Sequence, residues 1–327
     1  MNLNDILKQA YDDNSMIMFE LGLYYHRIED YTNMKKYYNM AINSGNSDAM
    51  NCLGCYYYDN EDYDNMKKYY HMAIEKNNST AMHNLALYYH YIMENISLMK
   101  KYYHMAIEQG NITSMFNLGV YYDEIKDYTN MKKYYLLAIE KGHNKALYNM
   151  GCYYRNIGDY DNMKKYYLLA IEKGHNKPIY NLGCYYRDIK DYNNMKKYYL
   201  LAIEKGYIKA LYNMGYHYQI IKDYDNMIKY YNMAIDNGNS NAMHNMGCYY
   251  RDIKDYDNMK KYYNMAINLD DSNSMTSLGY YYQFIEKDYD NMIKYYDMAI
   301  KCGSMMAKNN LDYYYRDVNN MLWRDCF

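Results

Sequence analysis

Seven cysteines and nine histidines are the residues of this sequence whose chemistry could support catalysis or metal binding. Cys52 and Cys55 form a Cys-x-x-Cys pair, a spacing found in redox centres and zinc sites. The histidines are scattered, with no H-E-x-x-H motif and no His–Cys set at ligand spacing. No Ser-His-Asp or other nucleophile motif is present either. We therefore predict that the protein is not an enzyme and that it has no metal and no cofactor.

The cysteines have a structural interpretation instead. Cys55, Cys152, Cys184 and Cys248 occupy one slot of an internal repeat, which holds Leu, Val or Tyr in the other copies. Equivalent slots on stacked helices lie about 8–10 Å or more apart, whereas a disulfide needs Cα atoms within about 7 Å. We therefore interpret the slot as a small apolar position.

The repeat is visible in a glycine that follows Leu or Met and precedes a tyrosine pair. We call this position the anchor slot. Successive anchors are 32 residues apart, with one step of 33. The nine anchors are Gly22, Gly54, Ala86, Gly119, Gly151, Gly183, Gly215, Gly247 and Gly279. Nine copies cover nearly the whole chain, and a tenth, partial copy has Asp312 in the anchor slot. The segments "HYIMENISLM" and "QFIEKDYDNM" each carry one extra residue in the turn between helices.

Each copy has the hydrophobic spacing of two helices. In the fifth copy they are predicted over 145–157 and 160–173. Asp159 is a good N-cap for the second helix, and Gly174 a good left-handed residue after it. A glycine inside a helix costs about 0.5–1 kcal/mol relative to alanine, so its recurrence at the anchor predicts close approach of a partner helix backbone.

These motifs resemble the tetratricopeptide repeat. Its L-G-x-x-Y pattern is represented by Leu182, Gly183 and Tyr186, followed by Met195, Tyr199 and Ala202. The departures are a methionine where that family prefers alanine, and a period of 32 rather than 34 residues. The connection "AIEKGHNKALYNMG" (138–151) looks instead like the Sel-one-like repeat. Both families form α-solenoids that bind other proteins. The composition, rich in Asn, Tyr and Lys, is similar to that of repeat proteins of giant DNA viruses.

Tyrosine is unusually frequent, with 55 residues, and 43 of them fall in five slots of the repeat. A residue type that recurs at the same positions in every copy indicates a packing role. We therefore expect one tyrosine of each pair to be deeply buried and the other to keep its hydroxyl in contact with water. The "DNMKK" segments predict surface Asp–Lys pairs four residues apart, as in Asp161/Lys165. The alternative is a lysine–tyrosine ladder for RNA, which the interleaved aspartates oppose.

Charge and hydropathy limit the possible environments. The net charge is −2, so no global field attracts nucleic acid, and a nucleic-acid partner is not favoured. We expect no signal peptide, and no apolar stretch approaches the length of about 18 residues needed to span a membrane. An odd number of cysteines fits reduced thiols. We expect a cytoplasmic protein, in the host cytoplasm if it is viral.

Residues that vary between copies indicate where a partner could bind. In the resembled families the first helix of each copy lines the concave surface. Its candidate face consists of the positions six before, three before, one after and four after the anchor, and we call it the first-helix face. Copies five to eight place an aromatic row there with Lys and Arg beside it. The predicted site residues are Lys145, Tyr148, Arg155, Lys177, Tyr180, Arg187, Lys209, Tyr212, His244 and Arg251.

The middle of this face is mildly basic, with five basic and three acidic residues in 143–174, whereas residues 1–60 have four basic and eight acidic ones. We therefore expect an acidic or carboxylate-bearing peptide, held by Arg155 and Arg187.

The sequence as a whole predicts an all-α protein, a right-handed α-solenoid of about nine helix pairs in a single repeat domain (1–327). Residues 1–14 are expected to form an N-terminal capping helix, 15–303 the nine repeats, and 304–327 a partial repeat and C-terminal cap. The predicted function is a protein–protein interaction scaffold. An RNA-binding repeat protein and a structural virion or assembly component remain alternatives. The sequence leaves the partner and the oligomeric state open.

Overall fold

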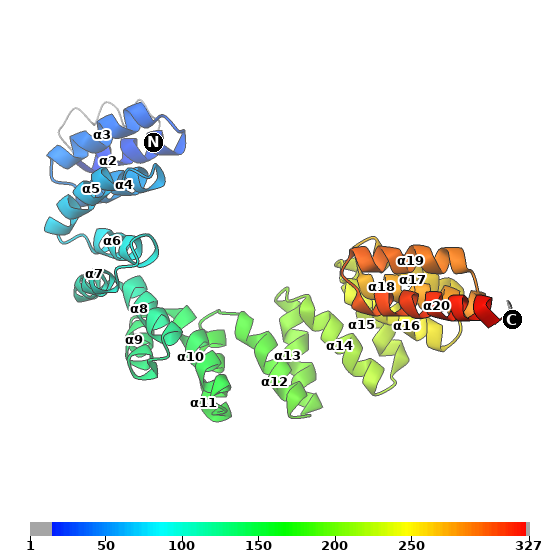
Figure 1. The fold of residues 1–327 in the computed structure, drawn as a ribbon. Helices are drawn as coiled ribbons and strands as arrows, with labels where there is room; N and C mark the ends of the chain where they lie inside the picture. Colours follow the sequence, from blue (N-terminus) through cyan, green and yellow to red (C-terminus); the bar gives the residue numbers. More distant parts are fainter. Residues whose placement is uncertain (1–14, 325–327) are drawn as a thin grey trace. The chain divides into compact units, whose positions relative to one another are not determined.

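The computed structural model describes residues 15–324, and their side chains as far as residue 316. Two compact units make up the chain, Met1–His175 and Asn176–Phe327. Apart from one π-helical turn, the regular elements of residues 15–324 are all α-helices (Figure 1). The predicted capping helix over 1–14 lies outside the described residues, and the single-domain organisation stays a prediction.

Helices follow one another in pairs in both units. The first unit contains α2 (Ser15–Arg27), α3 (Tyr31–Asn43), α4 (Ser47–Asp59), α5 (Tyr63–Glu75), α6 (Ser79–Tyr91), α7 (Ile96–Glu108), α8 (Ile112–Glu124), α9 (Tyr128–Glu140), α10 (Asn144–Asn156) and α11 (Tyr160–Glu172). The second contains α12 (Lys177–Asp188), α13 (Tyr192–Glu204), α14 (Lys209–Ile220), α15 (Tyr224–Asp236), α16 (Ser240–Asp252), α17 (Tyr256–Ile267), α18 (Ser272–Tyr281), the π-helix η2 (Tyr282–Glu286), α19 (Tyr289–Lys301) and α20 (Met305–Arg324). The predicted nine helix pairs of the α-solenoid are confirmed as α2–α19. The helix α20 lies within the segment predicted to be a partial repeat and cap, a role that stays a prediction.

The predicted helix ends are confirmed. Asp159 caps α11: its Oδ1 accepts from the backbone N–H of Asn162 at 3.1 Å, and its Oδ2 accepts from the Asn162 side chain at 2.7 Å. Gly174, after the helix, has φ +82°, the left-handed conformation that glycine adopts most easily. A second left-handed residue lies in the short turn within each copy and is usually Lys or Glu, such as Lys254 at φ 62°. The sequence had not indicated this second position.

Acid should weaken the second helices together. Eight of them start at an aspartate whose pKa is lowered by hydrogen bonds from the asparagine three residues later: Asp30, Asp62, Asp127, Asp159, Asp191, Asp223, Asp255 and Asp288. A carboxyl with a lowered folded-state pKa stabilises the fold above its unfolded pKa of about 3.9, and this contribution is lost as pH falls through the folded value. We expect the urea concentration at the unfolding midpoint to decrease when the pH drops below about 4. The variant Asp159→Asn, which keeps a cap, should make that decrease slightly smaller. An unchanged midpoint between pH 5 and 3 would contradict this.

The anchor glycine makes room for an aromatic ring. A Cβ atom on Gly183 would lie 2.4 Å from Cδ1 of Tyr199, on the second helix of the same copy. The other seven anchor glycines have the same relation to the last tyrosine of "KKYY" or its equivalent, at 2.3–2.5 Å. The expected close approach therefore occurs, but the neighbour is a tyrosine ring and not a helix backbone. We call this residue the core tyrosine; in the nine copies it is Tyr38, Tyr70, Tyr103, Tyr135, Tyr167, Tyr199, Tyr231, Tyr263 and Tyr296, and each is at most 3% exposed.

The tyrosines at the other repeat positions make ring contacts with one another. In the eighth copy, Tyr262 stacks on Tyr250 with centroids 5.4 Å apart and planes 7° from parallel. Tyr249 contacts Tyr224 of the preceding copy at 5.2 Å. One tyrosine of the "KKYY" pair is thus buried, as expected, while its neighbour stacks inside its own copy. The tyrosines therefore join helices both within copies and between them.

The lysines lie over these rings. Lys165 Nζ is 5.7 Å from the centroid of Tyr166, within cation–π range. Asp161 pairs with Lys164 at 3.0 Å, three residues along the helix, so the predicted Asp161/Lys165 pairing is wrong. The second lysine extends toward the aromatic ring beside it, which leaves the first lysine nearer the aspartate.

In the ninth copy, a π-helix accommodates the extra residue. The predicted insertion in "QFIEKDYDNM" coincides with η2, which ends at the left-handed Lys287, φ 57°. Single π turns commonly arise in this way. Glu286 pairs with Lys260 of α17 and accepts a 2.8 Å hydrogen bond from the Tyr281 hydroxyl. The inserted turn is therefore tied to the preceding copy.

Candidate functional site

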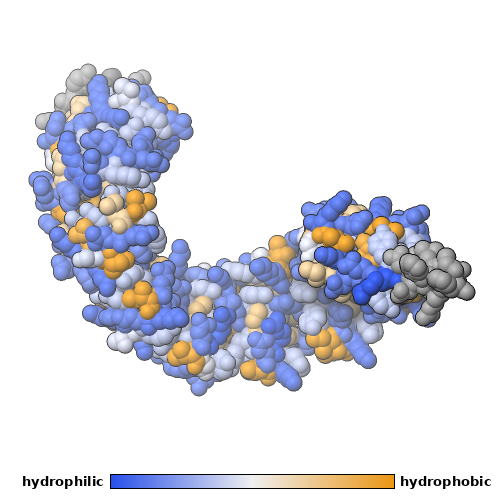
Figure 2. Space-filling view, in the orientation of Figure 1, coloured by the Kyte–Doolittle hydropathy of each residue, from blue (hydrophilic) through white to orange (hydrophobic). Residues whose placement is uncertain are grey.

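The first helices of neighbouring copies contact one another inside each unit. Such contacts join α2 to α4 and α4 to α6, and in the second unit α14 to α16, α16 to α18 and α18 to α20. Space-filling shows a visible surface that is mostly hydrophilic, with hydrophobic side chains in small separate groups (Figure 2).

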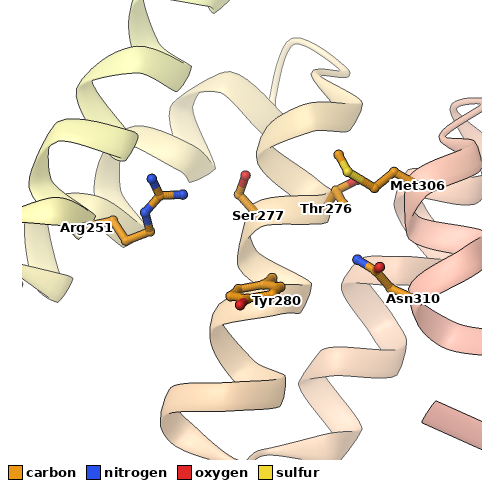
Figure 3. A pocket seen from close by; sticks show the side chains of 6 residues that line it. All are labelled: Arg251, Thr276, Ser277, Tyr280, Met306 and Asn310. Carbon is orange, nitrogen blue, oxygen red and sulfur yellow. The ribbon is translucent and has the colours of Figure 1, made fainter. Parts of the chain in front are cut away.

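A pocket of about 450 Å³ lies on the first-helix face of the second unit. It is lined by Arg251 of α16, by Thr276, Ser277 and Tyr280 of α18, and by Met306 and Asn310 of α20 (Figure 3). Four of these occupy predicted positions: Met306 is six before an anchor, Thr276 three before, Tyr280 one after and Arg251 four after. The variable face of the sequence thus coincides with a real hollow.

A smaller pocket of about 170 Å³ occurs on the same face of the first unit. Its lining is Cys55, Tyr58, Asp59, Tyr70, Asn84 and Leu87. The charged residue is an aspartate here and an arginine in the larger pocket. This difference agrees with the acidic balance that the sequence has near its N-terminus.

The predicted cations lie on the surface. Lys145, Lys177 and Lys209 are exposed, as are Arg155, Arg187 and Arg251. Two arginines already have a carboxylate: Arg187 bonds Asp188 and Arg251 bonds Asp252, both at 2.8 Å. The residue after Arg155 is the uncharged Asn156. Ion pairs this exposed contribute about 0–1 kcal/mol, so a ligand could replace the aspartates.

The predicted aromatic row is half-buried. Tyr180 lies 6.0 Å from the core tyrosine Tyr199, and its hydroxyl accepts a hydrogen bond from Asn213 of the next copy at 3.1 Å. Burial raises the pKa of Tyr180. Tyr148 and Tyr212 contact Tyr167 and Tyr231 in the same way. Their rings contact the second helix of their own copy and remain partly exposed.

The predicted site residues belong to both units. Lys145, Tyr148 and Arg155 lie in the first unit, and the others lie in the second. Three of them lie on each of α10 and α12, and two on each of α14 and α16.

An asparagine that the sequence analysis passed over binds the core tyrosines. It lies two before the anchor: Asn213 donates to the Tyr199 hydroxyl at 3.3 Å and Asn245 to that of Tyr231 at 3.0 Å. Asparagine fills this slot in six consecutive copies: Asn84, Asn117, Asn149, Asn181, Asn213 and Asn245. That regularity was available in the sequence, but only the fold shows which hydroxyl it binds.

His244 contacts polar groups of its own and the next copy. Its Nδ1 lies 2.9 Å from Ser274 Oγ and 3.6 Å from Asp271 Oδ2, and its Nε2 lies 3.4 Å from Cys248 Sγ. In the described part of the chain, no group of three or more His, Cys, Asp or Glu residues is arranged to hold a metal ion. The helices of that part include none with the length and apolarity to span a bilayer.

The repeated helix pairs and the face formed by their first helices define an α-solenoid of the kind typically used as a non-enzymatic scaffold for protein–protein interaction. Residues 112–140, 145–172, 177–204, 208–237 and 240–273 match the tetratricopeptide repeat family. These five segments are similar to the tetratricopeptide repeat, and the fold is that of a helical-repeat α-solenoid.

Solved structures that are similar to this chain include the following two. One is c5321, a protective antigen of uropathogenic Escherichia coli that displays an SLR fold, with 21% identity over 95% of this chain and 74% of that one, and a TM-score of 0.65. The other is a Sel1 repeat protein from Oxalobacter formigenes, with 17% identity over 92% of this chain and 93% of that one, and a TM-score of 0.67. At these identities the likeness is one of fold. No curated protein matches the sequence, and the resemblance to giant-virus proteins stays a prediction.

Proposed function

We propose that the protein is a scaffold whose first-helix face binds a partner protein through a segment bearing a carboxylate. The observation that carries this proposal is the 450 Å³ pocket at Arg251. A guanidinium group favours planar, bidentate recognition of carboxylates. Arg155 and Arg187 offer the same group on α10 and α12, each at the repeat position that Arg251 occupies in its own copy.

The pocket combines this cation with apolar and polar walls. Tyr280 and Met306 are 52% and 57% exposed, so a hydrophobic side chain of the partner would bury their surface. Asn310 donates to the Tyr296 hydroxyl at 3.4 Å, which leaves its side-chain oxygen as an acceptor for a peptide N–H. The lining therefore suits a short segment in which an apolar residue precedes Asp, Glu or a chain terminus.

The test is a selection from a random peptide library displayed on phage, with the full chain as bait, followed by affinity measurements on the selected peptides. We expect enrichment of acidic residues next to apolar ones. Arg251→Glu should weaken these peptides at least about tenfold, since a desolvated charge pair typically contributes more than 1.4 kcal/mol. Selected peptides without acidic residues, or insensitive to Arg251→Glu, would refute the proposal.

Two variants sharpen this measurement. Lys254→Glu makes the same charge change in the nearby turn, at a left-handed slot that Glu29 and Glu61 fill in other copies, so it should fold and leave affinity within about twofold. Asp252→Asn removes the carboxylate paired with Arg251, and asparagine is native at this slot in the fifth copy, Asn156. We expect Asp252→Asn to strengthen binding severalfold, because the ligand no longer competes with Asp252.

The RNA-binding alternative is less well supported. Single-strand binders stack bases on exposed aromatic faces, but Tyr250 and Tyr262 stack on each other, and Lys261 lies 5.4 Å above Tyr262. The lysines and rings of the ladder thus already contact one another. Binding of a uridine-rich oligonucleotide that weakens steeply with salt would favour RNA instead. A structural role in an assembly would leave the peptide selection without enriched sequences.

A further inference from the structure

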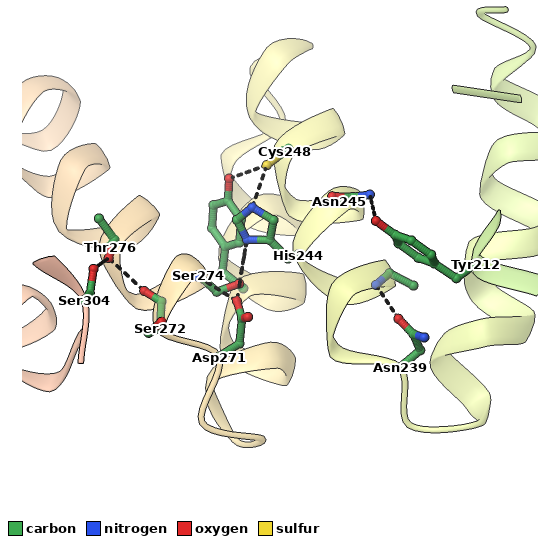
Figure 4. Close-up of polar contacts among 12 residues, drawn as sticks. Tyr212, Asn239, His244, Asn245, Cys248, Asp271, Ser272, Ser274, Thr276 and Ser304 are labelled. Carbon is green, nitrogen blue, oxygen red and sulfur yellow. Dashed lines mark hydrogen bonds and ion pairs between the residues drawn. The ribbon is translucent and has the colours of Figure 1, made fainter. Parts of the chain in front are cut away.

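Cys248, His244 and Asp271 form a linked polar cluster in the second unit (Figure 4). Cys248 and His244 lie one helical turn apart on α16, with Sγ and Nε2 3.4 Å apart. The other ring nitrogen of His244 faces Ser274 Oγ at 2.9 Å and Asp271 Oδ2 at 3.6 Å. Asp271 is held by its role as N-cap of α18, accepting from the Ser274 N–H at 2.7 Å. A histidine is thus oriented between a carboxylate and a thiol.

The same repeat slot holds other cysteines without this histidine. Cys184 and Cys152 contact the hydroxyls of their core tyrosines at 3.5 and 3.4 Å, as Cys248 contacts Tyr263 at 3.4 Å. The slot three before the anchor is tyrosine in those copies, Tyr180 and Tyr148, and histidine only beside Cys248. Cys184 therefore serves as an internal reference for Cys248.

The third copy holds the histidine without the thiol. His83 Nδ1 lies 2.8 Å from Ser114 Oγ, which matches the pair His244 and Ser274. The cysteine slot there is Leu87, and the N-cap slot of Asp271 is Asn111. Burial lowers the pKa of His83 to about 4, so a histidine in this setting with neither partner stays neutral.

The groups around His244 reverse that effect. Burial acts to lower its pKa, but the Cys248 thiol and the Asp271 charge outweigh it, against the opposing charge of Arg251, and the pKa is raised. Burial likewise acts to raise the pKa of Cys248, but His244, the Tyr263 hydroxyl and Arg251 lower it. By contrast, burial raises the pKa of Cys55, where asparagine replaces the histidine. The charged form of the cluster is a thiolate–imidazolium pair.

We propose that Cys248 is a reactive modification site, a thiolate paired with the imidazolium of His244 that reacts with peroxides and small electrophiles. Thiolates beside a protonated histidine are the nucleophilic form of cysteine. Cys248 is partly exposed, so small reagents can reach it. It lies inside α16, where backbone N–H groups are bonded within the helix, so no donors are available for an acyl-transfer intermediate. Oxidation and alkylation need no such donors.

The reaction with hydrogen peroxide balances within the cluster. The Cys248 sulfur attacks one peroxide oxygen, and the S–O bond forms as the O–O bond breaks. Sulfur is oxidised by two electrons to a sulfenic acid, and the peroxide is reduced. The hydroxide that leaves takes the imidazolium proton of His244 and becomes water. The reaction does not require peptide binding, since Cys248, His244 and Asp271 do not line the pocket at Arg251.

The test treats the full chain with hydrogen peroxide and dimedone at pH 6.5 and follows each cysteine-containing peptide by mass spectrometry. We expect Cys248 to react about tenfold faster than Cys184, because only Cys248 has a histidine beside its sulfur that can hold it as the nucleophilic thiolate. His244→Tyr, which installs the residue native beside Cys184, should lower the Cys248 rate to within about twofold of Cys184. Equal rates for Cys248 and Cys184 in the native chain would overturn the proposal.

A second variant separates charge from structure. Asp271→Asn keeps an N-cap residue that the fourth copy uses in the same slot, Asn111, and should slow Cys248 severalfold while the melting curve stays unchanged. The pH profile adds an independent reading: the native rate should persist to lower pH than in His244→Tyr. If Cys248 reacts with the native pH profile in both Asp271→Asn and His244→Tyr, the cluster is only a packing arrangement.

Discussion

Gly183→Ala is expected to destabilise the second unit by about 1–3 kcal/mol, the usual range for overpacking a well-filled core. This is the reverse of the ordinary helix preference, in which alanine is better than glycine by about 0.5–1 kcal/mol. The reason is that the added Cβ would lie 2.4 Å from Cδ1 and 2.6 Å from Cε1 of Tyr199, a core tyrosine that is completely buried. Urea denaturation followed by circular dichroism measures the effect.

Two companion variants distinguish ring contact from helix propensity. Ala86 fills the anchor slot of the third copy and is itself fully buried, so Ala86→Gly should also destabilise, by about 0.5–1 kcal/mol. In a Tyr199→Leu background the clash is removed, and Gly183→Ala should become neutral or slightly stabilising, which a double-mutant cycle detects as coupling. Additive effects of Gly183→Ala and Tyr199→Leu would show that the glycine does not serve the ring.

The first unit should lose on the order of 2–3 kcal/mol of stability between pH 6.5 and 4 through His83. Burial lowers the pKa of His83 to about 4, whereas a histidine in the unfolded chain titrates near about 6.5. Between these values the unfolded state binds the proton and the folded state does not. The contribution of neutral His83 is therefore complete above pH 6.5 and is lost as pH falls to about 4. Urea midpoints measured at half-unit pH intervals test this.

A natural pattern in the chain supplies the control. Phe116 and Ala146 occupy, one copy further on, the slots of His83 and Ser114. The double variant His83→Phe with Ser114→Ala therefore restores packing without leaving the buried serine unpaired. This double variant should remove most of the pH dependence of the urea midpoint at pH values above those at which the capping aspartates titrate. If its midpoint follows the same pH curve as the native chain, other groups carry the effect.

Local signals predicted most of the fold. The 32-residue period, Asp159 and Gly174 predicted the position of α11 within one residue, because caps and left-handed turns depend on neighbouring backbone groups. The left-handed Lys254 escaped prediction, since lysine has no intrinsic preference for positive φ. The pairing of Asp161 with Lys164 was also missed, because it depends on where the ring of Tyr166 holds Lys165.

The candidate site could be predicted only in outline. The variable slots identified the face on which the pocket lies, and Arg251 and its position were predicted from the sequence. The pocket itself was not, because Arg251, Thr276 and Met306 come from different copies and meet only when α16, α18 and α20 are packed. The carboxylate at Asp252, which lowers the availability of Arg251, was visible in the sequence as its neighbour but not as its partner.

The sequence by itself determined the repeat, its helix boundaries and the surface that varies, because all three are periodic properties of one chain. Tertiary structure decided which side chains meet across copies. The anchor glycine faces a ring sixteen residues away, and Cys248 differs from Cys184 only through His244 and Asp271. Such contacts depend on the superposition of helices whose residues are 15 to 33 positions apart, and no local pattern encodes that superposition.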